Sequence, residues 1–179
     1  VDITASTGIN FRHLNGAKNN YQLPETLGAG GAFFDYDNDG YVDLFMANGH
    51  VQDNIEQLDG STSYPQRNLL FHNNGDWTFT NASLTSGEGL QNLKASRGTA
   101  FGDYDNDGDV DLFVLNSNDR ADLLRNEGGN RNFYLIVRLV GTESNRNGIG
   151  AKVRVVSGTL RQIKEVRSGS SYLSQNDLR

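Results

Sequence analysis

The sequence predicts a mostly β fold, and three observations carry that prediction. Gly is abundant, with 21 residues in 179, whereas Pro occurs only twice, and chains built from short strands and tight turns have such a composition. A 17-residue segment occurs twice, which is typical of stacked structural repeats. No stretch combines helical periodicity with helix caps. We therefore expect short strands joined by turns.

The repeated segment occupies residues 32–48 and 100–116. It reads AFFDYDNDGYVDLFMAN in the first copy and AFGDYDNDGDVDLFVLN in the second, so 13 of 17 positions are identical at an offset of 68. A weaker similarity follows each copy, LLFHNNG from Leu69 and LLRNEGG from Leu123, at an offset of 54. Each unit is expected to contain a strand, an acidic loop, a second strand, a further loop and a third strand.

Short apolar runs and alternating segments give the positions of the strands. The acidic loop of the first repeat lies between two such runs, and the segment after it has the pattern of a hairpin around Asn-Asn-Gly-Asp. The tail alternates polar and apolar residues, which is typical of half-exposed strands. The expected strands are residues 32–34 and 42–46, the hairpin strands 69–71 and 77–80 around the turn 73–76, and the tail segments 152–156 and 162–166.

The charge is divided unevenly along the chain. The net charge is −6, of which residues 1–130 carry −12 and residues 131–179 carry +6. This change in charge predicts a boundary near Gly128–Asn130, and hence a domain of residues 1–130 followed by one of residues 131–179. The basic residues of the tail alternate along strands without interleaved aromatics, which favours a solvated face over nucleic-acid binding. No apolar run is long enough for membrane insertion.

Each acidic loop has the spacing of a calcium site. Carboxylates at positions 1, 3, 5 and 9 of a tight loop, with Gly at position 6 and a backbone carbonyl at position 7, form an all-oxygen ligand set that suits Ca²⁺ better than Zn²⁺. Position 12 is apolar, so neither loop is an EF-hand. The alternative for a single copy is a solvated acidic turn. The predicted ligands of two Ca²⁺ ions are Asp35, Asp37, Asp39, Tyr41 (carbonyl) and Asp43, and Asp103, Asp105, Asp107, Asp109 (carbonyl) and Asp111.

The chain lacks the sequence patterns of a catalytic site. His13, His50 and His72 have no ligand spacing, and we interpret them as surface or turn residues. No Ser has the G-x-S-x-G context of a nucleophile elbow, and the Gly-rich stretch at Gly28 leads into a strand and not into a phosphate-binding helix. The sequence therefore predicts a protein that is not an enzyme.

The two acidic segments, GAFFDYDNDGYVDLFMANG and GTAFGDYDNDGDVDLFVLNSN, resemble the FG-GAP/VCBS repeats of integrin-α-like β-propellers. That resemblance implies that each repeat is about one propeller blade, with Ca²⁺ in its D-x-D-x-D-G loop. Two blades make an incomplete propeller. The tail, with a first strand at Tyr134–Val140 and the motifs SNRNGIGAKVRV and GSSYLSQND, resembles the ASPIC/UnbV domain of cartilage-acidic-protein-like secreted proteins. This resemblance implies a small C-terminal β domain, which here stops short of its usual end.

These features predict an extracellular, secreted or cell-surface, calcium-binding structural or adhesion module. One alternative is the subunit of a fibre in which open sheet edges pair between molecules, helped by the acidic first part and the basic tail. A second alternative is a lectin-like module, in which aromatics such as Tyr64, Trp77 and Tyr172 stack on glycans. The expected partners are therefore other proteins, further copies of the chain, or glycans. Asn81 begins an Asn-Ala-Ser sequon and is a candidate glycosylation site.

Overall fold

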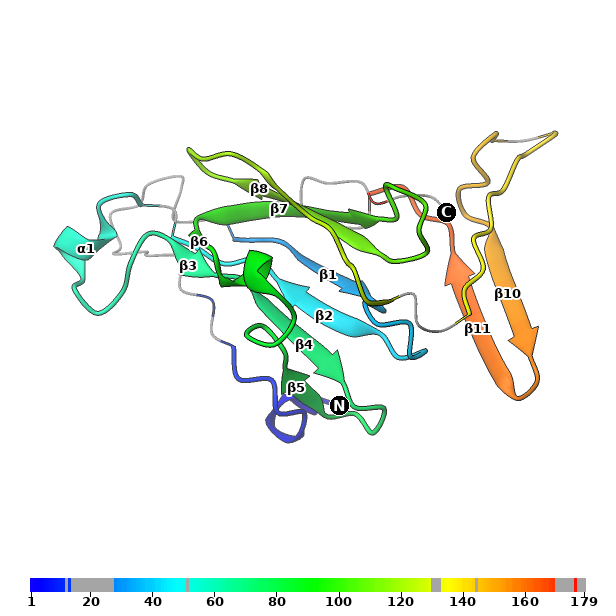
Figure 1. The fold of residues 1–179 in the computed structure, drawn as a ribbon, viewed down its shortest axis with the longest axis horizontal. Coiled ribbons are helices and arrows are strands. Elements are labelled where there is room, and N and C mark those ends of the chain that lie inside the picture. The colour runs from blue at the N-terminus through cyan, green and yellow to red at the C-terminus, as the bar shows by residue number, and fades with distance from the viewer. Residues whose placement is uncertain are drawn as a thin grey trace.

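The computed structural model describes residues 1–11, 13, 28–50, 52–129, 133–143, 145–169 and 176. Strands dominate this part of the chain and form four separate antiparallel sheets, which confirms the mostly β class. Figure 1 shows the two larger sheets lying against each other, with a two-stranded hairpin beside them. The helical elements are short: η1 (Thr4–Ser6), α1 (Ile55–Leu58) and η3 (Glu88–Gln91).

The first sheet contains the strands of the first repeat. The acidic loop joins its first two strands, and the register places Phe34 opposite Asp43 and Ala32 opposite Phe45. The predicted hairpin forms, but Trp77 lies in the turn with a positive φ of 70° and is not part of a strand. In spatial order the sheet consists of β1 (Gly31–Phe34), β2 (Asp43–Met46), β4 (Leu69–Asn73) and β5 (Phe79–Asn81).

The second sheet repeats the first three strands of this arrangement. Leu44 pairs with Phe71 between β2 and β4, and Leu112 pairs with Leu124 in the second sheet. The third strands are therefore equivalent at an offset of 53. The offset of 54, predicted from the similar segments LLFHNNG and LLRNEGG, is wrong by one residue. The sheet consists of β7 (Ser96–Gly102), β8 (Asp111–Asn116) and β9 (Asp122–Leu124).

The first repeat has a longer connection between its second and third strands than the second repeat. This connection contains α1, whose Ile55 is fully buried. It ends in β3 (Gln66–Arg67), which pairs with β6 (Leu93–Lys94) just before the second repeat begins. The longer connection therefore helps to hold the two repeats together through the pairing of β3 with β6.

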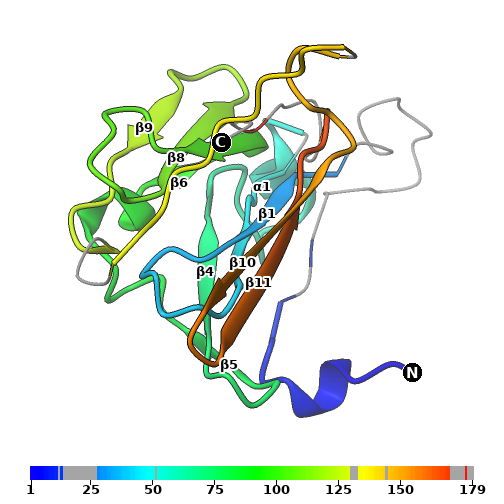
Figure 2. The same ribbon diagram turned by 90° about the vertical axis from the view of Figure 1, so that its right-hand side faces the viewer.

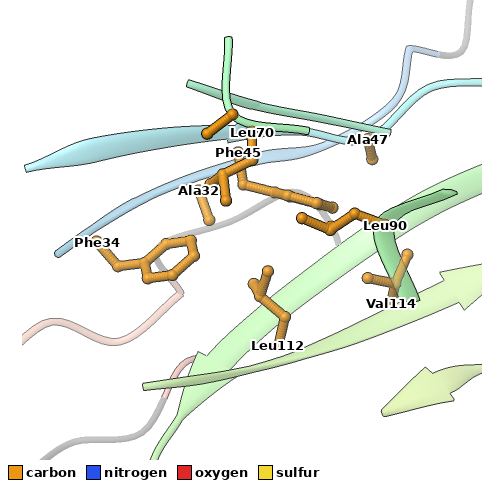
Figure 3. Close-up of a cluster of buried hydrophobic side chains, with 9 residues drawn as sticks. Ala32, Phe34, Phe45, Ala47, Leu70, Leu90, Leu112 and Val114 are labelled. Carbon is orange, nitrogen blue, oxygen red and sulfur yellow. The ribbon is translucent and has the colours of Figure 1, made fainter. Parts of the chain in front are cut away.

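The main core lies between the two larger sheets (Figure 3). Residues at alternate positions of β1 and β2 face residues at alternate positions of β8, as the two-residue period of a strand requires. The rings of Phe34 and Phe101 stack across this interface with their centroids 5.5 Å apart. The buried apolar residues of the cluster are Ala32, Phe34, Phe45, Ala47, Leu70, Ala82, Leu90, Leu112 and Val114.

The tail forms a hairpin that both Figure 1 and Figure 2 place beside the two sheets. Its strands, β10 (Lys152–Ser157) and β11 (Leu160–Glu165), match the two predicted alternating segments. The strand expected at Tyr134–Val140 does not form, because that segment pairs with no strand of the described residues and is largely exposed. The predicted boundary at 130/131 lies outside the described residues and stays a prediction.

Candidate metal centre

Both acidic loops have the same backbone shape. The first loop connects β1 to β2, and the second connects β7 to β8. Asn38 and Asn106, at position 4, have φ values of 55° and 62°, and Gly40 and Gly108, at position 6, have φ values of 93° and 97°. Asn and Gly are the residues that adopt this left-handed conformation most readily. The Asn-Asp-Gly sequence therefore turns each loop back on itself.

The first carboxylate of each loop holds the loop closed. The carboxylate of Asp35 accepts hydrogen bonds from the backbone N–H groups of Asp39, at 3.1 Å, and Gly40, at 2.9 Å. Asp103 accepts the equivalent bonds from Asp107, at 3.1 Å, and Gly108, at 3.2 Å. These bonds direct the first carboxylate into the loop.

The last carboxylate of each loop joins the loop to the third strand of its sheet or to the residues that directly follow that strand. Asp43 is fully buried and accepts the N–H of Tyr36 at 3.0 Å and the N–H of Asn73 at 2.8 Å. Asp111 accepts the N–H groups of the equivalent residues, Tyr104 at 3.1 Å and Asn126 at 2.8 Å. Position 9 is therefore part of the scaffold as well as a predicted ligand.

The structure brings most of the predicted ligands together. Carboxylate oxygens of Asp35, Asp37 and Asp39 lie within 4.8 Å of one another. Those of Asp103, Asp105 and Asp111 do the same in the second loop, whereas Asp107 is not in that group. A second group in the first loop combines Asp37 and Asp43 with His72.

The position-7 residues, whose carbonyls are predicted ligands, differ between the loops. The side chain of Tyr41 is exposed, and its ring lies over the turn at Gly75. The side chain of Asp109 is fully buried and accepts the N–H of Gly129 at 3.1 Å. The participation of the two carbonyls stays a prediction.

Sequence reasoning missed a His or Arg side chain beside each loop. His72 Nδ1 lies 3.3 Å from Asp37 Oδ2 and 3.4 Å from Asp43 Oδ1. Arg125 Nε lies 3.1 Å from Asp105 Oδ2. His72 and Arg125 occupy equivalent positions at the offset of 53, so the correct register of the third strands would have indicated the pair.

The interpretation of the three His residues as surface or turn residues is wrong for His50. That side chain is buried, its Nε2 contacts the hydroxyl of Thr62, and its backbone carbonyl accepts a hydrogen bond from Arg97. His13 is partly buried, and burial together with the charge of Arg97 lowers its pKa. Neither residue belongs to an acidic loop.

The two loops also contact each other. Asn38 Nδ2, in the first loop, donates to the carbonyls of Gly129 at 2.8 Å and Gly108 at 3.3 Å. Asn126 Nδ2, next to the second loop, donates to the carbonyl of Tyr36 at 2.6 Å. The two candidate sites therefore share a hydrogen-bonded boundary.

Gathering these carboxylates has an electrostatic cost. Burial raises the pKa of Asp43 to about 6, and Asp37 adds to the shift by repulsion. Burial also raises the pKa values of Asp35, Asp109 and Asp111, again with contributions from neighbouring carboxylates. Asp37 Oδ1 and Asp109 Oδ1 are buried without a hydrogen-bond partner in the structure. An all-carboxylate site with unsatisfied oxygens fits a hard divalent cation.

The raised pKa of Asp43 predicts how stability depends on pH in metal-free buffer. An unfolded Asp has a pKa of about 3.9, so between about pH 4 and pH 6 the folded state binds more protons than the unfolded state. The free energy of unfolding should therefore decrease as pH rises, by about 1 kcal/mol from pH 5 to pH 7 for this group alone. Urea unfolding at the two pH values measures the change. Asp43→Asn should flatten the profile, and a metal-free protein that is more stable at pH 7 than at pH 5 would contradict the prediction.

The glycan predictions rest on Asn81 and on the aromatic residues Tyr64, Trp77 and Tyr172, of which Tyr64 is half-buried. Asn81 is exposed at the end of β5, and its Oδ1 accepts hydrogen bonds from the N–H of Ser83 at 3.0 Å and from the Ser83 hydroxyl at 2.7 Å. Trp77 is exposed at the β4–β5 turn. Tyr172 lies outside the described residues. Glycosylation at Asn81 and glycan binding stay predictions.

Comparison with known families agrees with the geometry. The family model of the FG-GAP-like repeat matches residues 35–114, which include both acidic loops. The model named ASPIC and UnbV matches residues 141–179. Searches of curated proteins and of solved structures found no match. FG-GAP repeats are propeller blades and typically occur in extracellular or surface proteins. Among the described residues, no helix has the length and apolarity needed to cross a membrane. The chain thus combines an FG-GAP-like repeat region with an ASPIC and UnbV region, in that order from the N- to the C-terminus.

Proposed function

We propose that the chain is a non-enzymatic, extracellular calcium-binding module with a structural or adhesive role, in which one Ca²⁺ ion stabilises each acidic loop. The observation that carries the proposal is that two separate copies of the loop adopt the same hydrogen-bond scaffold. In each copy, positions 1 and 9 are fixed by backbone N–H groups. A solvated acidic turn would not require the same backbone hydrogen bonds in both copies.

The fixed carboxylates retain the capacity to bind a cation. An ionised carboxylate has about four lone-pair sites, so Asp35 and Asp43 still have acceptor capacity after accepting two backbone hydrogen bonds each. The bound Ca²⁺ supplies positive charge that offsets the repulsion among the carboxylates. The proposed ligands are Asp35, Asp37, Asp39, the Tyr41 carbonyl and Asp43 in the first site, and Asp103, Asp105, Asp107, the Asp109 carbonyl and Asp111 in the second.

Isothermal titration with Ca²⁺ tests the proposal directly. Two ions should bind per chain, and Asp37→Ala and Asp105→Ala should each leave one, because each substitution removes a ligand from one loop only. Asp76→Ala is the matched control, since this exposed Asp lies in the β4–β5 turn, away from both clusters. Binding of fewer than two ions by the unsubstituted chain, or normal stoichiometry in both loop variants, would contradict the proposal.

The non-enzymatic part of the proposal has its own test. The carboxylates of the two loops hold the scaffold together through backbone hydrogen bonds and are proposed to bind cations, so they are not available as an acid–base pair. We expect no turnover of glycoside, ester or phosphoester substrates. Turnover that a single point substitution abolishes would show that the chain is an enzyme.

A further inference from the structure

The packing between the two sheets provides a template for a second interface. On the first sheet, Ala32, Phe45 and Leu70 are buried against the second sheet. The second sheet contributes Leu112 and Val114 to the same cluster. Figure 3 shows these side chains meeting between β1–β2 and β7–β8. One face of the first repeat therefore packs on the opposite face of the second.

The second sheet carries the same apolar face as the first, but there it is exposed. At offsets of 68 and 53, Ala32, Phe45, Ala47 and Leu70 correspond to Ala100, Phe113, Leu115 and Leu123. Of these, Phe113 is 42% exposed, Leu115 43% and Leu123 52%. We call these four residues the outer face of the second sheet: Ala100, Phe113, Leu115 and Leu123.

An apolar outer face is unusual for a repeat that faces solvent. Terminal repeats of stacked arrays have polar outer surfaces, because an apolar one lowers solubility. Exposed apolar patches on soluble proteins commonly mark interaction sites. The counterpart of Phe34 in this sheet is Gly102, which lies beside a hollow of about 330 Å³. Apolar side chains such as Phe113 and Leu123 line this hollow together with Asp103, Tyr104 and Asp111 of the second acidic loop. The hollow leaves room for an apolar side chain from a docked partner.

The first sheet presents the complementary surface on its side away from the second sheet. Phe101 of β7 and Val110, which directly precedes β8, pack against the core. Their counterparts in the first sheet at the offset of 68 are Phe33, which is 64% exposed, and Val42, which is 50% exposed. Leu44 and Phe71 are already buried within the chain, so Phe33 and Val42 form the outer face of the first sheet.

We propose that a second copy of the chain docks its Phe33 and Val42 on the outer face of the second sheet, and so repeats the internal packing between molecules. Within one chain, Phe101 of the second sheet packs beside Phe34 of the first. In the proposed contact, Phe33 of one copy takes the role of Phe101 and enters the hollow beside Gly102 of the other copy. The two faces differ, so the contact is heterologous and propagates into an open stack unless it closes. Sheets stack face to face here, whereas the fibre alternative joins strand edges.

The charge of the chain gives this contact a distinctive salt dependence. Both faces lie within residues 1–130, which carry a net charge of −12. Salt screens repulsion between exposed charges, so added NaCl should strengthen face-to-face stacking. An assembly that joined the acidic first part to the basic tail would instead weaken in salt. The direction of the salt effect therefore separates the two modes of association.

Sedimentation velocity with Ca²⁺ present tests the proposal over the micromolar concentration range. The unsubstituted chain should form concentration-dependent oligomers. Phe33→Ser and Phe113→Ser should each weaken self-association by about tenfold or more, because truncating a central aromatic removes much of the energy of such an interface. Leu58→Ser is the matched control, since Leu58 is about as exposed as Phe113 but lies in α1, away from both faces.

A mixture of the two variants gives the sharpest result. Each variant keeps one intact face, so an equimolar mixture of Phe33→Ser and Phe113→Ser chains should form dimers that grow no further. A monomeric unsubstituted chain at all concentrations, or association of Phe113→Ser as strong as that of the unsubstituted chain, would overturn the proposal. Calcium titration of the same samples is a separate readout: normal Ca²⁺ binding by a strictly monomeric chain would reject the stacking and leave the proposed function intact.

Discussion

Removal of calcium is expected to lower the melting temperature of the chain by roughly 10–20 °C. A ligand that binds only the folded state adds about 2.7 kcal/mol at a hundredfold excess over its Kd, so two sites add about 5 kcal/mol. For a chain of this size, 1 kcal/mol changes the melting temperature by roughly 2–4 °C. The physical cause is the buried carboxylates, whose raised pKa values show that their charged forms are disfavoured without a cation.

Differential scanning calorimetry with Ca²⁺ and with EGTA measures this effect. Asp37→Ala and Asp105→Ala should each show about half of the calcium-dependent increase, because each retains one site. Replacement of Ca²⁺ by Mg²⁺ should restore less of the stability, since Mg²⁺ requires a tighter octahedral geometry and keeps several of its waters. An unchanged melting temperature in EGTA would show that the loops are stable acidic turns without a structural cation.

Asp43→Ala is expected to destabilise even the calcium-free chain, by about 2–4 kcal/mol. Asp43 accepts the backbone N–H groups of Tyr36 and Asn73, and each buried donor that loses its partner costs about 1–3 kcal/mol. Removal of a disfavoured buried charge offsets part of this loss. The loss remains because the two hydrogen bonds join β2 to the acidic loop and to β4.

Urea unfolding in EGTA, with Asp37→Ala as the comparison, isolates this scaffold role. Asp37 is a predicted ligand that faces His72, and its Oδ1 accepts no hydrogen bond in the structure. Its removal should therefore leave the calcium-free stability nearly unchanged and reduce only the increase on adding calcium. Equal losses for the two variants in EGTA would show that Asp43 has no special role in the scaffold.

The sequence alone determined the features that depend on neighbours in the chain. Asp35 reaches the N–H groups of residues four and five positions later, and Asn38 and Gly40 supply the left-handed turn between them. Such contacts follow from spacing and residue type, so the two acidic loops, their flanking strands and the β4–β5 hairpin could be predicted. The alternating tail segments became β10 and β11 for the same local reason.

Only the tertiary structure decided which distant segments meet. Asn126 reaches Tyr36 across 90 positions, and no local pattern specifies such a pair. The positions of His72 and Arg125 beside the acidic loops depend on the register of the third strand. Alignment of the two repeat sequences gave that register wrong by one residue. Residues 134–140 have strand-like composition but gain no ladder hydrogen bonds in the described part of the chain, because a strand needs a neighbour. Likewise, Phe45 and Phe113 occupy equivalent positions, yet Phe45 is buried and Phe113 exposed, because burial depends on whether another sheet covers the face.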